Sequence, residues 1–161
     1  MRLNLNLDGM EIWLGVNGYT PSTRENWDYQ WCDVDFSFKF ENVINYSKDD
    51  DEVLLSCEIE EIVSVFTKLL NDEYTEKFRL GFIEPDFEFE ILPKDDKGDM
   101  LVEWHVNLWH EGLTGNYFSV CLDRNDISTM RDYLKCIVGT LSKDSIEIQE
   151  LITKGIIKKY Y

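Results

Sequence analysis

The chain has 161 residues, enough to bury a sizeable hydrophobic core in one domain without a metal or a disulfide framework. Its 32 Asp and Glu residues outnumber 16 Lys and Arg residues, which gives a formal net charge of -16, and 43% of the residues are hydrophobic. The apolar content excludes a disordered chain, and the charge disfavours direct contact with nucleic acid or an anionic membrane. The same charge either attracts basic proteins and cations or serves only solubility.

The first residues, MRLNLNLDGMEIW, alternate apolar and polar side chains and lack the apolar core of a signal peptide. No stretch approaches the roughly 18 apolar residues that a membrane helix requires. The four cysteines are widely spaced, with no CxxC and no neighbouring histidine, so they predict neither a zinc site nor a disulfide framework. They are Cys32, Cys57, Cys121 and Cys136. We therefore expect a cytoplasmic protein with reduced, mostly buried thiols and no cofactor.

The first 40 residues predict β-structure. Two alternating runs, residues 3–7 and 10–16, flank Asp8-Gly9, and this dipeptide between two such runs is a strong hairpin signal. Residues 32–40 alternate again and predict a third strand with one solvated face.

In the next part of the chain, composition and spacing predict two polar loops and a helix. Residues 18–30 predict an ordered loop anchored by the rings of Tyr19, Trp27 and Tyr29, and residues 47–52, SKDDDE, predict a solvated loop. Ser56 is the expected N-cap of a helix with an apolar stripe. The stripe consists of Ile59, Ile62, Val63, Phe66, Leu69 and Leu70.

Residues 77–123 predict a four-stranded antiparallel meander. Pairing Phe78 with Ile91 and Leu80 with Phe89 places the apolar side chains of the first hairpin on one face. The opposite face then carries Arg79, Asp86, Glu88 and Glu90, with Arg79 opposite Glu90. The same counting along residues 100–110 sets Glu88 opposite Glu103. It also brings His105, Asn107 and Trp109 beside Tyr117, Ser119 and Cys121.

The C-terminal part predicts two helices. Apolar residues recur at helical spacing from residue 126 to 141 behind a cap at Asp123 or Asn125, and a short helix spans Ser145–Lys154 before Gly155. The order is three strands, helix, four strands and two helices. We therefore predict one α+β domain over residues 1–161, with an antiparallel sheet of about seven strands packed by two or three helices.

A search for catalytic or metal-binding patterns predicts none. His105 and His110 lie five apart on one strand, so their side chains point to opposite faces and form no metal pair. The carboxylates of Asp33 and Asp35 share one strand face, and so do those of Asp86, Glu88 and Glu90. Neither set is accompanied by a nucleophile, an oriented base or further ligands at metal spacing.

The remaining signal is negative charge beside exposed rings, which is typical of a protein-binding surface. If Glu88 lies opposite Glu103, like charges face each other, and either a cationic partner or solvation must relieve them. The candidate partner-binding residues are Asp33, Asp35, Asp86, Glu88, Glu103, His105, Trp109 and Tyr117.

Several motifs occur together along the chain. Trp27 and Trp31 precede an alternating strand, Leu54-Leu55-Ser56 leads into an acidic amphipathic helix, and residues 82–90, FIEPDFEFE, precede a long strand. In this combination the chain resembles the WapI-type immunity proteins of bacterial polymorphic-toxin systems over roughly residues 10–138. The EPDFEFE run is the most specific part of the resemblance, and the segment after Leu141 has no counterpart in it.

The resemblance implies a small cytoplasmic protein that binds and neutralises the C-terminal toxin domain of an effector, often a nuclease. It implies no active site and identifies no contact residues. Two other functions stay open from the residues alone. One is an acidic nucleic-acid mimic or adaptor that binds another basic protein, and the other is an enzyme or Ca²⁺-binding module that uses Asp86, Glu88 and Glu90.

Overall fold

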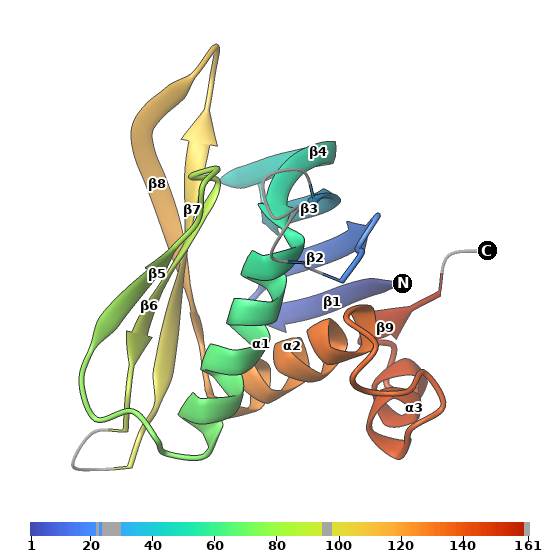
Figure 1. Ribbon diagram of the computed structural model, residues 1–161. Helices are drawn as coiled ribbons and strands as arrows, with labels where there is room; N and C mark the ends of the chain where they lie inside the picture. The colour runs from blue at the N-terminus through green and yellow to red at the C-terminus, as the bar shows by residue number, and fades with distance from the viewer. Residues whose placement is uncertain (22, 24–29, 95–97, 160–161) are drawn as a thin grey trace.

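The computed structural model describes residues 1–161 except 22, 24–29, 95–97 and 160–161 (Figure 1). The described part contains three helices and nine strands in two antiparallel sheets, which confirms the α+β class. The elements are β1 (Arg2–Leu7), β2 (Met10–Asn17), β3 (Trp31–Phe40), β4 (Ile44–Leu55), α1 (Ser56–Leu70), β5 (Phe78–Gly81), β6 (Phe87–Leu92), β7 (Leu101–Trp109), β8 (Leu113–Leu122), α2 (Arg124–Ile137), α3 (Ile146–Thr153) and β9 (Ile157–Lys158).

The five-stranded sheet has the order β4-β3-β2-β1-β9. Its first hairpin turns at Asp8-Gly9, where both residues have positive φ angles, as the sequence predicts. The prediction of a solvated loop at residues 47–52 is wrong, because this segment belongs to β4. As an edge strand, β4 tolerates charged side chains that would be unfavourable in the middle of a sheet. Its pairing with β3 is also interrupted by register shifts, and Asp50 nearby has a φ of 55°.

The four-stranded sheet is the predicted meander, with the order β5-β6-β7-β8. The pairing of Phe78 with Ile91 and of Arg79 with Glu90 is confirmed. The expected pairing of Glu88 with Glu103 is wrong, because Glu88 pairs with His105 and Glu90 pairs with Glu103. A shift of two residues leaves every side chain on its predicted face. The alternating pattern therefore fixes the face of each residue but not its partner.

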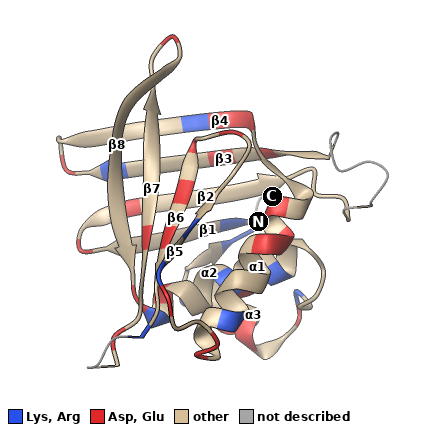
Figure 2. Ribbon diagram, turned by 60° about the vertical axis from the view of Figure 1, so that its left-hand side comes forward, with Lys and Arg blue, Asp and Glu red and all other residues tan. Residues whose placement is uncertain are grey.

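The two sheets pack face to face through aromatic side chains. The ring centroids of Phe36 and Phe87 are 4.7 Å apart, and those of Phe38 and Trp104 are 4.9 Å apart. Helices α1 and α2 lie between the lower parts of the sheets (Figure 1), where Phe66 packs against Phe89 at 5.5 Å. In the view of Figure 2, the strands of the meander run across those of the five-stranded sheet. This packing buries one face of each sheet and leaves the other face of the meander to carry polar groups.

Strand β4 runs directly into α1, and this connection changes the expected cap. The N-cap is Leu55 rather than Ser56, whose buried hydroxyl lies 3.5 Å from the Cys32 thiol. Leu55 has no side-chain acceptor, but Glu58 binds it from within the helix, because Glu58 Oε2 accepts a hydrogen bond from Leu55 N–H at 2.8 Å. Its Oε1 accepts a second hydrogen bond from Ile83 N–H, also at 2.8 Å. Glu58 therefore ties the start of α1 to the turn between β5 and β6.

The ends of the other helices agree largely with the sequence. Asp123, one of the two predicted caps, begins α2 by accepting hydrogen bonds from the N–H groups of Asn125 and Asp126. Helix α2 ends at Ile137, before the expected residue 141, because Gly139 adopts a φ of 78° that terminates the helix. Ser145 caps α3, and Gly155 follows it with a φ of 73°. None of the described helices is long and apolar enough to cross a membrane.

The predictions for the cysteines and for the aromatic loop agree with the structure only in part. Of the four free cysteines, Cys32 and Cys136 are buried, Cys57 is half-buried and Cys121 is exposed. Within the predicted aromatic loop, the Tyr19 hydroxyl donates a hydrogen bond to Glu60 at 2.8 Å. Trp27 and Tyr29 lie outside the described residues.

We expect Glu58→Gln to lower the free energy of unfolding by about 1–3 kcal/mol. An amide has one acceptor oxygen, so glutamine can satisfy only one of the two N–H groups, from Leu55 and Ile83, that the carboxylate satisfies now. Urea denaturation at pH 7 measures the change. The matched control is Glu61→Gln on the exposed side of α1, which should stay within about 0.5 kcal/mol of the wild type. Equal losses in both variants would contradict this role of Glu58.

Candidate functional site

The polar side of the meander, here called the outer face, brings together four of the eight predicted partner-binding residues, Glu88, Glu103, His105 and Tyr117. It is formed by alternate residues of four strands that point away from the aromatic core. They are Arg79, Glu88, Glu90, Glu103, His105, Asn107, Tyr117, Ser119 and Cys121.

A network of ion pairs crosses the strands of the outer face. Glu90 is only 7% exposed and pairs with Lys77 Nζ at 2.6 Å and with Arg79 Nε at 3.6 Å. The other end of the guanidinium group contacts Glu88 at 3.0 Å. The hydrogen bond from Lys77 lowers the pKa of Glu90, and the charges of Arg79 and His105 add to this effect. The network keeps Glu90 ionised in a poorly solvated position.

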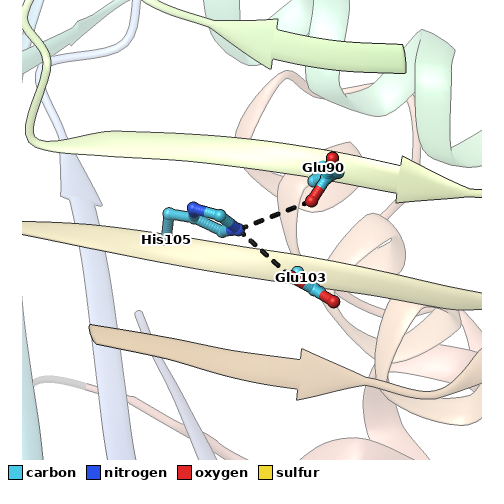
Figure 3. A group of neighbouring side chains, drawn as sticks. All are labelled: Glu90, Glu103 and His105. Carbon is cyan, nitrogen blue, oxygen red and sulfur yellow. Dashed lines mark hydrogen bonds and ion pairs between the residues drawn. The ribbon is translucent and has the colours of Figure 1, made fainter. Parts of the chain in front are cut away.

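His105 forms the centre of the outer face (Figure 3). Its Nε2 lies 3.3 Å from Glu103 Oε2 and 4.0 Å from Glu90 Oε2. The three groups offer ligand atoms within 4.8 Å of one another, a combination that could hold a divalent cation. However, Lys77 and Arg79 already neutralise Glu90, and a metal would have to compete with both. The geometry is that of a cross-strand charge network.

Tyr117 covers the imidazole of His105. The two rings are parallel within 8°, with centroids 5.1 Å apart, and the tyrosine is 58% exposed. Together with Arg79, Glu88 and Asn107 they line a pocket of about 170 Å³. The structure thus brings Glu88, His105 and Tyr117 together, with Glu103 beside them. An exposed ring surrounded by carboxylates suits a cationic protein surface.

Asp86 and Trp109 lie in a different environment, at the junction of the two sheets. Asp86 is 3% exposed and pairs with Lys48 Nζ from β4 at 2.7 Å, and Lys48 also pairs with Asp51 at 2.9 Å. The ammonium group lies 4.8 Å from the centroid of the Trp109 ring. Burial raises the pKa of Asp86, although Lys48 opposes the shift. Burial also acts to lower the pKa of Lys48, but its two carboxylate partners outweigh that effect and raise it.

Asp33 and Asp35 do not belong to the outer face, because they lie on β3 of the five-stranded sheet. They alternate with the buried residues of β3, so they point away from the core on the opposite side of the molecule from the outer face. Asp35 accepts hydrogen bonds from Asn17 Nδ2 at 3.3 Å and from Asp50 N–H at 2.7 Å. A single flat partner surface cannot contact these aspartates and Tyr117 together.

The structure gives roles to residues outside the predicted partner-binding set. Arg79, Glu90 and Asn107, which the sequence places on this face, belong to the charge network and the pocket, and Lys77 joins them by pairing with Glu90. No sequence pattern indicates Lys48. It contacts Asp86 from the other sheet, and it lies on β4, whose polar composition predicts a loop.

Comparison with known protein families identifies the chain. The sequence model of the immunity protein WapI-like family matches residues 2–141. The protein belongs to this family. The match confirms the resemblance and extends it at both ends, so it covers strands β1 to β8, helices α1 and α2, and the whole outer face. Comparisons with curated proteins and with solved structures gave no match.

We expect Lys48→Met to cost about 3 kcal/mol of folding free energy, because it leaves the Asp86 carboxylate buried without its partner. Lys39→Met, at an exposed lysine of the adjacent strand, is the control and should change stability by less than about 0.5 kcal/mol. Guanidinium denaturation measures both variants. A loss no larger than that of the control would show that the ion pair contributes nothing.

The same variant should show a particular pH dependence. Burial holds the pKa of Asp86 above its unfolded value, and removing Lys48 raises it further. Between the unfolded and folded pKa values the folded state binds more protons, so stability falls as pH rises through this window. The difference between the wild type and Lys48→Met should therefore shrink as the pH is lowered from 7 towards about 4. If the difference in unfolding free energy stayed constant with pH, the destabilisation would not come from the ionised Asp86 carboxylate.

Proposed function

We propose that this member of the WapI-like immunity family binds a cognate bacterial toxin domain in the cytoplasm and neutralises it by stoichiometric inhibition, without catalysis. The observation that carries the proposal is the family match over residues 2–141. We further propose that the toxin domain is basic and acts as a nuclease.

The charge of the chain supports a basic target. A nuclease must present cationic side chains to the phosphates of its substrate, and a protein with a net charge of -16 complements such a surface. Asp and Glu residues occur on both sheets, on the connecting turns and on α1 (Figure 2). Complementary charge would accelerate association and favour occlusion of the substrate site. Family membership favours a toxin domain over the alternative of an unrelated nucleic-acid-binding partner.

We place the contact on the outer face. Tyr117 offers an exposed ring, and Glu88 and Glu103 flank it with carboxylates that are 30% and 34% exposed. A cationic side chain entering the adjacent pocket could exchange the contacts of these carboxylates for stronger ones across an interface. Asp33 and Asp35 would then serve long-range attraction, because they lie on the opposite side of the molecule.

Co-production with the toxin domain encoded beside this gene tests the proposal. The expected results are rescue of growth, a 1:1 complex in size-exclusion chromatography and an association rate constant that falls as salt is raised. The toxin should regain its activity when the complex is dissociated, because binding alone inhibits it. A protein that neither binds the toxin domain nor protects the cell would refute the function.

A charge reversal tests the location of the contact. Glu103→Lys should weaken toxin binding by about tenfold or more and slow association, because it removes an attractive charge and adds a repulsive one. Glu147→Lys makes the same change on the exposed side of α3, outside the family match, and should change the dissociation constant less than about threefold. Surface plasmon resonance at two salt concentrations compares them. Equal effects would show that only the total charge matters.

A further inference from the structure

The described sheets have four edges, and three of them are protected against pairing with another chain. Strands β5 and β9 are only four and two residues long. Strand β4 is long, but it carries a run of charged residues and is interrupted by register shifts. Short strands, charges and bulges are the usual means by which proteins block free edges.

Strand β8, the fourth edge, is neither short nor charged. Its pairing with β7 has one register shift, between Asn107 and Trp109, and is regular from Tyr117 to Leu122. Its ten residues, LTGNYFSVCL, include no charged residue and no proline, whereas 30% of the whole chain is charged. Within the described residues β7 is its sheet neighbour, and the opposite edge of β8 has no strand. Residues 113–117 are all exposed. A long, uncharged and open edge is a template for another strand.

An apolar groove runs beside this edge, between β8 and the turns of the five-stranded sheet. One part, of about 370 Å³, is lined by Met10, Phe40, Ile44 and Val120 among others. A second part, of about 300 Å³, shares Ile44 and continues to Val43, Leu108 and Phe118. Val43 is 76% exposed, which is unusual for an aliphatic residue beside other apolar side chains. The groove can take alternate side chains of a strand laid along β8.

The charges around the groove indicate a basic occupant. No Lys or Arg lines either part, and Asp8 lines the first. The exposed Glu41 belongs to the same turn as Val43. Burial raises the pKa of Asp126 where β8 leads into α2, and Asp123 and Asp8 raise it further, so three carboxylates converge at that end. A second copy of this chain would bring another charge of -16 to the same place and be repelled.

We propose that an extended segment of the toxin domain, with alternating apolar side chains and at least one basic residue, adds to the free edge of β8 as a fifth strand. Backbone hydrogen bonds to β8 would supply affinity, and the groove would select the side chains. The edge is continuous with the outer face, since Tyr117 belongs to both. This inference rests on the proposed toxin-binding function and specifies how the toxin is held.

Amide hydrogen exchange on the full-length protein tests the proposal, with the inactivated toxin domain encoded beside its gene as the probe. In the free protein, the amides of residues 117–121 that point away from β7 should exchange rapidly. In the complex, alternate amides of this segment should exchange at least about tenfold more slowly. If a complex forms without this protection, strand addition is refuted while the proposed function stands. If no complex forms, both are refuted. Protection that grows with protein concentration in the absence of toxin would identify a second copy as the occupant and overturn the assignment.

A pair of substitutions tests the groove without disturbing the core. Val43→Lys places a positive charge at its exposed end and should raise the dissociation constant for the toxin domain about tenfold or more. Ile146→Lys makes an equivalent change at a residue that is 75% exposed on α3, and should alter binding less than about twofold. Unchanged thermal unfolding of both variants confirms that they fold. Equal dissociation constants for the two would overturn a role for the groove.

Discussion

The structure depends on the aromatic layer between the two sheets. Phe36 and Phe38 of one sheet meet Phe87 and Trp104 of the other, and α1 adds Phe66 against Phe89. Because these rings help to remove the facing sides of the two sheets from water, side chains at the alternate positions must point outward or find partners. The packing that forms the core therefore also decides which acidic side chains face outward. The outer face is the consequence, and its residues alternate with buried ones along β6 and β7.

Each buried carboxylate has its own partners. Glu58 accepts hydrogen bonds from two backbone N–H groups, Asp86 pairs with Lys48 at the sheet junction, and Glu90 pairs with Lys77 and Arg79. The contacts of Glu58 with Ile83 and of Asp86 with Lys48 join segments that are distant in sequence, so each also fixes the position of one element against another. Buried carboxylates of this kind cost desolvation energy, and their contribution is to specify one arrangement of the sheets and helices.

The proposed binding surfaces follow from these constraints. An immunity protein that binds a toxin domain, as we propose, must recognise that partner while keeping its own edges from pairing at random. Three edges are short or charged, and the fourth combines an open backbone with an apolar groove and acidic ends. The outer face adds an exposed tyrosine above a histidine and its carboxylates. Backbone pairing, apolar contact and charge are thus available next to one another along β8, at the edge of the meander.

The sequence by itself determined the alternating strands, the approximate ends of α2 and α3, the face on which each meander residue lies, and the family. It also narrowed the cap of α2 to two residues. These features depend on neighbours along the chain, where periodicity and capping chemistry act directly. Only the tertiary structure decided that there are two sheets, that SKDDDE is an edge strand, and that Glu88 pairs with His105. It also separated Asp33 and Asp35 from the outer face and buried Asp86 beside Lys48. Those outcomes depend on which surfaces meet across the core, and a period of two residues is compatible with several registers and with more than one sheet.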